Sequence, residues 1–312
     1  MHVAYGFEDL NELKRSWLTI GNFDGVHLGH RMMLRELIAC ARRDGEKAVV
    51  LSFDPPPLAV LKPDLVLQRL TTHARKIELL HEVGVDGLVV CQTSLGLLDL
   101  SARDFFEQII VEKLQVTGIL EGPNFFFGKN RGGDIAMLQA LSEEHGIRTK
   151  IVESLGVDGE MISSTRIRQY LLSGDVMKAG ELLGQPYELT GRVVTGAQRG
   201  RLLGMPTANL ATVLTVVPAQ GVYAGRVEIG GRDYAAAVHI GPNPTFEEGE
   251  SKIEVHVLDF SGDLYGSALS VTFFERLRGL EKFPDKDALV AQIGRDVKNA
   301  RDCYQRVWSS RL

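Results

Sequence analysis

Apolar residues in the first half of the chain occur as short continuous runs that alternate with segments in which they recur at helical spacing. The runs predict strands at residues 17–20, 47–53, 87–91, 118–121 and 149–153, with helices between them near 34–41, 74–83, 105–114 and 135–144. Continuous apolar strands are typical of a parallel sheet that helices cover on both faces. This half is therefore predicted to be an α/β domain with a Rossmann-like parallel sheet.

Two shorter helical patterns follow at residues 164–172 and 175–183. Gly174 lies between them and Gly184 follows the second, where glycine commonly ends a helix. The pair Gln185 and Pro186 then breaks the pattern, and we place a domain boundary there. The first predicted domain covers residues 1–186, and the second covers residues 187–312.

The pattern changes in the second domain to short β-branched or alternating runs that are separated by Gly, Pro and Asp. They predict strands at residues 189–195, 221–229, 234–240, 253–260 and 268–274, with no helices between them. Such a series predicts a small antiparallel β-barrel. A C-terminal helix is predicted to begin at Pro284 and Asp285, and its apolar face contains Leu289, Ile293, Val297 and Ala300.

Composition narrows the class of protein. The chain has 312 residues, which suits two domains of roughly 150 residues each. Its net charge of −5 argues against nucleic acid as a partner, because nucleic-acid-binding domains carry basic patches. Cys40, Cys91 and Cys303 lie far apart, which fits a reducing compartment. Without a signal-peptide pattern or a membrane-spanning apolar run, we expect a soluble cytoplasmic protein with no membrane partner; the sequence does not indicate its oligomeric state.

Glycine and histidine concentrate in the segment 21–30 (GNFDGVHLGH), between a predicted strand and a predicted helix. An open α/β sheet places its ligand site there, outside the carboxyl ends of its strands. Gly21 allows a tight turn, Gly29 allows a ligand to approach closely, and the helix N-terminus attracts phosphate. His27 and His30 are three residues apart, so both can face a phosphoryl group from one side of the helix. An isolated histidine more often only packs, but H-x-G-H after a first strand resembles the motif of the nucleotidyltransferase superfamily.

A second phosphate-binding element is predicted at residues 162–168 (ISSTRIR), where a helix begins. The hydroxyl groups of Ser163, Ser164 and Thr165 can cap the helix or donate to phosphates. Arg168 lies one turn further and can bring a permanent cation to a triphosphate. The alternative is a capped surface helix with basic side chains. The presence of H-x-G-H in the same domain favours phosphate binding.

Twelve segments in the same order make the chain resemble, over nearly its full length, the bacterial bifunctional riboflavin kinase/FAD synthetase family. They are GNFDGVHLGH (21–30), FDPPP (53–57), LTT (70–72), LSARDFF (100–106), GPNFFFGKNRGGD (122–134), ISSTRIR (162–168), GDVMKAGELLGQPY (174–187), GRLLGMPTANL (200–210), PAQGVY (218–223), GPNPTF (241–246), EVHVLDFSGDLYG (254–266) and LEKF (280–283). Twelve collinear segments are far more specific than any one of them.

The resemblance implies that the first domain adenylylates FMN to FAD, with the FMN phosphate attacking the α-phosphate of ATP. His27 and His30 would stabilise charge on ATP, and Asn124 would lie near the nucleotide or flavin. The residues assigned to ATP and its phosphates are Gly21, Phe23, Asp24, Gly29, Ser163, Ser164, Thr165 and Arg168. Of Phe125, Phe126 and Phe127, we expect one or two to belong to the core.

A second chemical site is predicted where glycines and arginines precede the segment 206–209 (PTAN) in the barrel domain. Glycines let backbone amides close around phosphates, and nearby cations balance the charge. The residues assigned to ATP here are Gly191, Gly196, Gly200 and Arg201. Thr207 and Asn209 would lie on the same side of an extended segment, and their hard oxygen ligands suit Mg²⁺ bound to ATP.

Glu254 and His256 alternate with valines, so both would share one face of a strand. A carboxylate near a magnesium–phosphate site can take the proton of a substrate hydroxyl. A lone glutamate on a strand more often only faces solvent, but the resemblance implies that Glu254 is the base that deprotonates the ribityl 5′-hydroxyl of riboflavin. The chain would then phosphorylate riboflavin to FMN and adenylylate FMN to FAD, with ATP as co-substrate of both steps and Mg²⁺ as the cofactor.

Other interpretations remain open at this point. Relatives often have Glu where this chain has Arg75. This difference leaves open that only one site is active and that the other domain is a flavin-binding or regulatory module. A nucleotidyltransferase with another acceptor would leave the segments 206–209 and 254–266 unexplained. A nucleic-acid-binding barrel lacks the aromatic and basic strand pattern that it needs. Asn124 is Asp in many relatives, which changes little.

Overall fold

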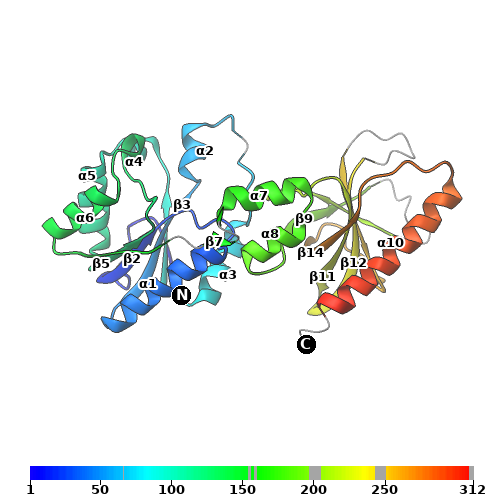
Figure 1. Ribbon diagram of the computed structural model, residues 1–312, viewed down its shortest axis with the longest axis horizontal. Coiled ribbons are helices and arrows are strands. Elements are labelled where there is room, and N and C mark those ends of the chain that lie inside the picture. The colour runs from blue at the N-terminus through cyan, green and yellow to red at the C-terminus, as the bar shows by residue number, and fades with distance from the viewer. Residues whose placement is uncertain (66, 154–155, 158–159, 197–204, 243–250, 309–312) are drawn as a thin grey trace. The chain divides into compact units, whose positions relative to one another are not determined.

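The computed structural model describes residues 1–65, 67–153, 156–157, 160–196, 205–242 and 251–308. It divides into two compact units (Figure 1). The first unit consists of Met1–Leu67 and His73–Ser163, and the second consists of Gln68–Thr72 and Ser164–Leu312. The domain boundary that we place between residues 186 and 187 remains a proposal.

A six-stranded, all-parallel sheet forms the centre of the first unit. Its strands are β1 (His2–Tyr5), β2 (Ser16–Ile20), β3 (Lys47–Asp54), β4 (Gly87–Gln92), β5 (Gly118–Glu121) and β6 (Arg148–Ile151), in the order β1-β4-β3-β2-β5-β6. Five of these strands coincide with the predicted apolar runs. The sequence analysis did not include β1, the edge strand.

Helices cover both faces of this sheet (Figure 1). Helices α1 (Leu28–Arg43) and α3 (His73–Val83) lie on one face; α5 (Ala102–Phe105), the π-helix η1 (Phe106–Leu114) and α6 (Ile135–Glu144) lie on the other. Alternate strand residues therefore enter different cores: Leu51 packs with the second group, whereas Val50 packs with the first. The remaining short elements are α2 (Pro57–Leu61), α4 (Leu95–Leu98), η2 (Lys129–Arg131), β7 (Gly156–Val157) and β8 (Glu160–Met161).

Trp17 on β2 lies opposite Gly118 on β5. A Cβ atom on Gly118 would lie 2.5 Å from the Trp17 indole, so position 118 has no room for a side chain. The indole Nε1–H donates to Asp44 at 2.8 Å, and the Arg148 guanidinium lies 5.3 Å from the ring centroid. Trp17 is 2 % exposed and belongs to the core beneath α1.

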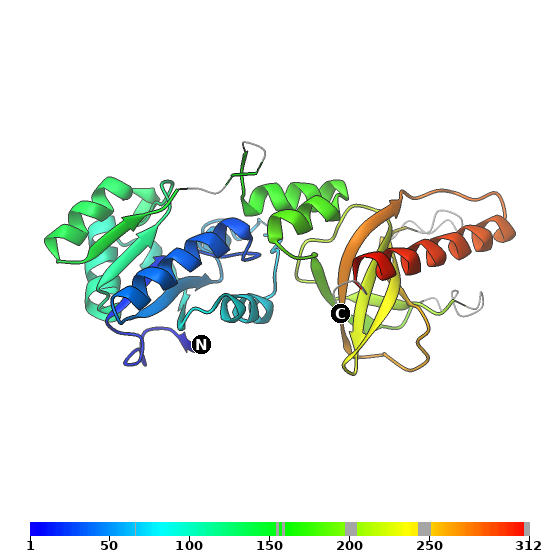
Figure 2. The same cartoon turned by 60° about the horizontal axis from the view of Figure 1, so that its bottom comes forward.

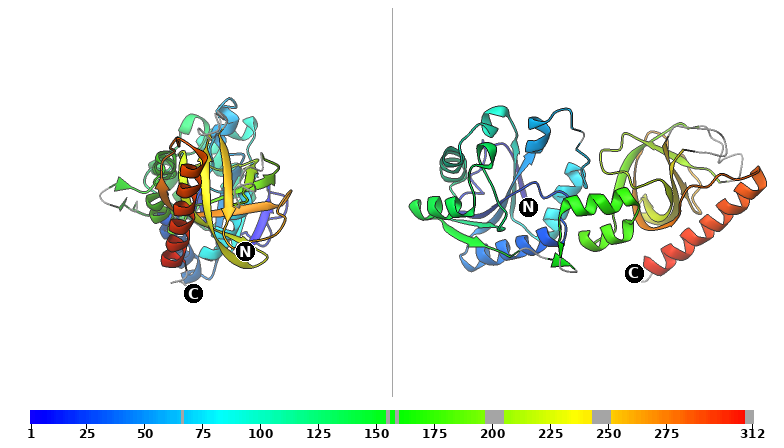
Figure 3. Two further views of the ribbon diagram at one scale, coloured as in Figure 1. Left: turned by 90° about the vertical axis from the view of Figure 1, so that its right-hand side faces the viewer. Right: turned by 45° about the horizontal axis from the view of Figure 1, so that its top comes forward.

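The second unit contains a closed, six-stranded antiparallel barrel (Figure 3, right). Its strands are β9 (Glu188–Val194), β10 (Ala208–Ala211), β11 (Gly221–Ile229), β12 (Arg232–Gly241), β13 (Lys252–Val257) and β14 (Ala268–Arg278), and they close in the order β10-β13-β12-β11-β14-β9. Five strands were predicted; β10 was expected only as an extended segment. The predicted fold class, a Rossmann-like parallel domain followed by an antiparallel barrel, is confirmed.

In the described part of the second unit, the helices are α7 (Ser164–Ser173), α8 (Val176–Leu183) and α10 (Lys286–Val307). Gly174 and Gly184 have φ values of +87° and +75°, the left-handed conformation that glycine adopts at low cost where helices end. The Asp285 carboxylate caps α10 by accepting the Ala288 N–H, as expected for the predicted helix start. Helix α10 runs along the outside of the barrel, where small residues such as Ala224 and Ala235 leave room for it (Figure 2).

Candidate functional site

The order of strands in the parallel sheet locates a binding crevice. From β2 the chain continues to β3 and β4 on one side and later returns to β5 and β6 on the other side. Ligands of open α/β sheets bind where the order reverses in this way, outside the carboxyl ends of the strands. Gly21 follows β2 and Asn124 lies three residues after β5, so two predicted site segments leave the sheet at this crevice.

The turn that follows β2 is strained. Phe23 and Val26 have φ values of +48° and +40°, which side chains larger than glycine rarely adopt, and Gly25 has a φ of +84°. Phe23 is 2 % exposed, and a Cβ atom on Gly21 would lie 3.1 Å from its ring. Such strain persists only where surrounding contacts enforce it, and it concentrates at functional sites. Asp24 lies half-buried in this turn.

His27 and His30 meet at the start of α1. Their rings stack with centroids 3.6 Å apart, and the His27 Nδ1 accepts the His30 backbone N–H at 3.2 Å. Because Nδ1 is an acceptor, the proton of a neutral His27 lies on Nε2, which is then a hydrogen-bond donor. A Cβ atom on Gly29 would lie 3.3 Å from the His27 ring, so glycine there lets this ring lie close against the first turn of α1.

Both imidazoles are neutral in the free protein. Burial lowers the pKa of His27 to about 4. Burial, and then the charge of His27, lower the pKa of His30 well below its ordinary value. The His30 Nδ1 is buried and has no hydrogen-bond partner among the described residues. The pair therefore offers hydrogen bonds to a phosphate before it offers charge, and the approach of an anion would raise both pKa values.

Glu121, which the sequence analysis missed, joins the carboxyl ends of β2 and β5 through hydrogen bonds. Its carboxyl group is 2 % exposed and accepts hydrogen bonds from the Ile20 N–H at 2.6 Å and the Thr19 hydroxyl at 3.3 Å. Burial raises its pKa to about 8, so the group is a neutral acid at neutral pH. The one signal in the sequence is a glutamate that ends an otherwise apolar strand, GILE.

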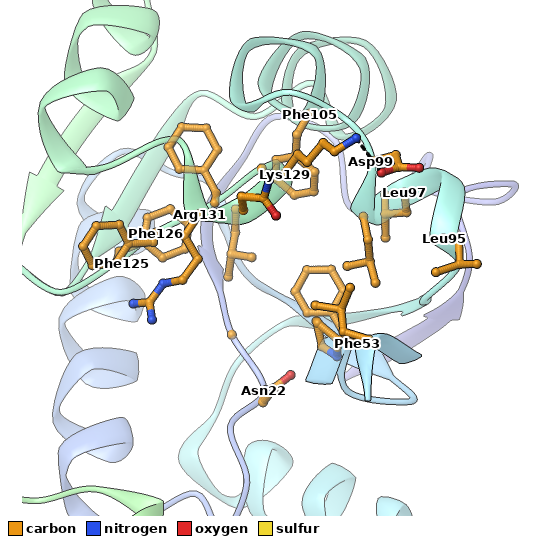
Figure 4. A pocket seen from close by; sticks show the side chains of 18 of the residues that line it. Asn22, Phe53, Leu95, Leu97, Asp99, Phe105, Phe125, Phe126, Lys129 and Arg131 are labelled. Carbon is orange, nitrogen blue, oxygen red and sulfur yellow. Dashed lines mark ion pairs between the residues drawn. The ribbon is translucent and has the colours of Figure 1, made fainter. Parts of the chain in front are cut away.

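A cavity of about 470 Å³ opens beside the turn (Figure 4). Its apolar lining consists of Ile20, Phe53, Pro57, Leu61, Leu95, Leu97, Leu98, Phe105, Phe125, Phe126 and Phe127. Polar groups stand at its edge: Asn124, an ion pair of 2.9 Å between Lys129 and Asp99, and the Arg131 guanidinium 4.4 Å from the Phe126 ring centroid. A cavity of this size with few polar groups suits a flat aromatic ligand.

The three phenylalanines of the segment after β5 have different roles. Phe127 is 6 % exposed and belongs to the core beneath α5, as expected for at least one of them. Phe125 stacks on Phe127 with ring centroids 5.6 Å apart. Phe126 is 44 % exposed. The sequence analysis included Lys129 and Arg131 in a matching segment but gave them no role.

The predicted phosphate-binding hydroxyls lie where helix α7 begins. Ser163 is the last residue of the first compact unit, and Ser164 and Thr165 begin α7 in the second. The Arg168 Nε–H donates to the Gln68 carbonyl at 2.7 Å within that second unit. The joint use of these residues with His27 remains a prediction.

Strand register brings the predicted kinase residues together. Asn209 on β10 lies directly opposite Glu254 on β13, so a predicted magnesium ligand and the predicted base are cross-strand neighbours. His239 on β12 lies opposite Glu254 on its other side. The His256 Nδ1–H donates to the Pro206 carbonyl at 2.9 Å and so fixes the segment that leads to Thr207.

A second cavity, of about 580 Å³, lies beside Thr207. Described residues that line it include Pro206, Ala208, Val255, Val257, Phe260, Gly262, Asp263, Leu264 and Tyr265. A Cβ atom on Gly196 would overlap the Asn209 amide, so a side chain there would displace this predicted magnesium ligand. Gly191 is buried within β9 against Leu210, which gives this glycine a packing reason. Gly200 and Arg201 lie outside the described residues.

Two family models match the chain in the same order as the two sites. The model described as FAD synthetase matches residues 9–166, and the model described as riboflavin kinase matches residues 183–304. The bifunctional riboflavin kinase/FMN adenylyltransferase of Escherichia coli K12 is 37% identical over 307 residues, which cover 97% of this chain and 98% of that protein. The Pseudomonas fluorescens protein of the same name is 36% identical and covers 96% of this chain and 97% of its own length.

A crystal structure of a protein named as a macrolide-efflux protein from Streptococcus pneumoniae has a similar fold. It is 33% identical, with a TM-score of 0.87, and the match covers 96% of this chain and 99% of that one. In the described part of this chain, no helix has the length and apolar character to cross a membrane. Two family models match consecutive parts of the chain, and relatives match it almost from end to end. The chain therefore belongs to the bifunctional riboflavin kinase/FMN adenylyltransferase family, which makes FMN and FAD.

Proposed function

We propose that the first unit transfers AMP from ATP to FMN at the carboxyl ends of β2 and β5. The FMN phosphate oxygen attacks the α-phosphorus of ATP and pyrophosphate leaves. The neutral His27 and His30 donate hydrogen bonds to oxygens on which charge develops, so they stabilise the transition state without acting as nucleophiles. The observation that carries this proposal is the stacked, buried histidine pair on the same turn whose first residues, Gly21 and Asn22, line the aromatic cavity.

Two further sets of predicted ATP residues belong to this proposal. Gly21, Phe23, Asp24 and Gly29 form the turn and helix start that receive phosphates, where backbone N–H groups and the helix dipole favour anions. Ser163, Ser164, Thr165 and Arg168, where α7 begins, remain predicted phosphate ligands on the ground of their sequence motif.

The flavin ring system occupies the 470 Å³ cavity in this proposal. Its aromatic walls match a flat aromatic ligand, and Asn124 at the edge offers both a donor and an acceptor to polar flavin atoms. Arg131, which lies over Phe126 at the same edge, is placed to meet the FMN phosphate.

We place riboflavin phosphorylation on the barrel. Glu254 takes the proton of the ribityl 5′-hydroxyl, whose oxygen attacks the γ-phosphorus of ATP, and ADP leaves. Mg²⁺ would be held by the oxygens of Thr207 and Asn209 together with phosphate oxygens and waters, and when bound it would neutralise phosphate charge. The fit rests on the register between Asn209 and Glu254 and on the hard oxygen donors. Gly191, Gly196, Gly200 and Arg201 belong to the predicted nucleotide loop.

The proposal includes a cytoplasmic enzyme with small-molecule substrates and no nucleic acid partner. Cys40, Cys91 and Cys303 are buried and form no disulfide, which fits a reducing compartment. The net charge of −5 fits a protein without a nucleic acid partner.

Chromatographic separation of flavins tests both activities. Purified protein is incubated with riboflavin, ATP and Mg²⁺, and FMN and then FAD should accumulate; the appearance of neither would refute the proposal. FMN without FAD would instead favour the single-site alternative. Glu254→Gln should abolish FMN formation, with a loss of about 10²- to 10⁴-fold, while added FMN is still converted to FAD. Glu228→Gln, which changes an exposed glutamate of β11, serves as the matched control for barrel folding and should retain FMN formation.

A further inference from the structure

A buried lysine lies beneath the strained turn that follows β2. Lys76 of α3 is 8 % exposed, and its Nζ donates to the Ser52 hydroxyl at 2.9 Å and to the Asn22 carbonyl at 3.4 Å. Ser52 of β3 is fully buried, and its hydroxyl donates to the same Asn22 carbonyl at 3.4 Å. Two donors from two elements therefore meet on one backbone oxygen of the turn.

The hydrogen bonds that hold the Asn22 carbonyl oxygen also determine the direction of the Phe23 N–H. The Asn22 carbonyl and the Phe23 N–H belong to one peptide group, and in a planar trans peptide they point in opposite directions. When Lys76 holds the carbonyl towards α3, the Phe23 N–H is directed away from α3. This N–H has no hydrogen-bond partner among the described residues. Asn22 itself lines the cavity that we assign to the flavin (Figure 4).

The conformation that results is costly for the turn. Phe23 has a φ of +48°, and a bulky side chain in the left-handed region needs surrounding contacts that enforce it. The Phe23 ring supplies one such contact by packing against His30, with centroids 5.0 Å apart. The hydrogen bonds from Lys76 and Ser52 supply the other, on the peptide that precedes Phe23. The Lys76 amine carries more than one N–H, so it can donate to the Asn22 carbonyl and to the Ser52 hydroxyl at the same time.

We propose that Lys76 and Ser52 are positioning residues for adenylyl transfer: by holding the Asn22 carbonyl, they direct the Phe23 N–H towards a phosphate oxygen of ATP. This inference rests on the proposed function of the first unit. Lys76 is nine-tenths buried, so it acts on the nucleotide through the turn and does not have to touch it.

Kinetics of the two half-reactions provide the first test. Lys76→Met removes the donors while keeping an unbranched side chain, and Ser52→Ala removes the second donor. We expect Lys76→Met to lower kcat/KM for ATP in FAD formation by about 10- to 100-fold, mainly through KM, and Ser52→Ala by about 2- to 10-fold. Riboflavin phosphorylation should be unchanged in both variants. Lys113→Met, which changes an exposed lysine of the same unit, should leave both half-reactions unchanged.

A spectroscopic test separates positioning from a general loss of structure. The Phe23 amide resonance is followed in protein labelled with ¹⁵N-phenylalanine while a non-hydrolysable ATP analogue is added. It should move in the native chain and respond much less in Lys76→Met. If the lysine variant does not fold, Ser52→Ala decides: an unchanged KM for ATP and an unchanged Phe23 response overturn the inference. A native chain that makes no FAD at all would instead refute the proposed function.

Discussion

The buried carboxyl group of Glu121 makes the stability of the first unit depend on pH. It is 2 % exposed, and burial raises its pKa from 4.5 to about 8. Below about pH 4.5 the folded and unfolded chains both carry the proton, so the group imposes no penalty. As the pH rises towards 8, the unfolded chain releases the proton and the folded chain keeps it, so the free energy of unfolding decreases.

The size of the effect follows from the two pKa values. The difference between 4.5 and about 8 corresponds to about 5 kcal/mol at about 1.36 kcal/mol per pH unit. This is an upper limit, because a folded unit can relax around an ionised carboxylate. Between about pH 5 and pH 8.5, the free energy of unfolding of the parent chain should fall by about 2 to 5 kcal/mol because of Glu121. Glu121→Gln should abolish this decrease. The amide oxygen can still accept the Ile20 N–H.

Urea unfolding can measure this change in the first unit alone. The two tryptophans of the chain are Trp17 and Trp308, so Trp308→Phe leaves fluorescence that reports only on the first unit. Glu143→Gln, an exposed glutamate of the same unit, is the matched control. Equal pH dependence in the Glu121 variant, the control variant and the parent would refute the assignment of Glu121 as a buried neutral acid.

Three other predictions concern the two sites. In NMR titrations, two of the eight histidines should not titrate between about pH 5.5 and 8, and substitution of His27 or His30 should identify them; ordinary titration of both would contradict their lowered pKa values. Arg75→Gln should change FAD formation by less than about twofold, because Arg75 forms ion pairs with two exposed glutamates of its own helix; a large loss would support altered flavin binding. His256→Phe should raise the KM for ATP in FMN formation by about 2- to 10-fold through loss of the bond to Pro206, with FAD formation as the control.

Most strands and helices could be predicted because buried elements contain continuous or periodic runs of apolar residues. Of the strands in the parallel sheet and the barrel, two were not predicted, for a physical reason. β1 is a four-residue edge strand with one buried residue, and β10 (ANLA) has no β-branched residue and follows Pro206 closely. Their pairing depends on partners distant in the sequence, which a local pattern cannot reveal. The left-handed conformation of Phe23 was equally hidden, since tertiary contacts override its local preference.

The candidate sites were found where residue type and motif agree, as in His27, His30 and Glu254. Two buried ionisable residues that hydrogen-bond to the backbone near the site, Glu121 and Lys76, were not predicted. Glu121 ends a predicted strand and Lys76 lies in a predicted helix, and both are buried. The sequence does not show which ionisable side chains become buried. These two groups differ from the predicted set in a consistent way: they hold backbone atoms of the site in place.

The contact between Trp17 and Gly118 has an evolutionary consequence. Because a Cβ atom at position 118 would lie 2.5 Å from the indole, a larger residue there requires a smaller residue at position 17. Either change alone is costly, since one overlaps atoms and the other leaves a void beneath α1. Among divergent homologues the two positions should therefore covary. A chain in which both residues change together should avoid the loss of stability that either single substitution causes.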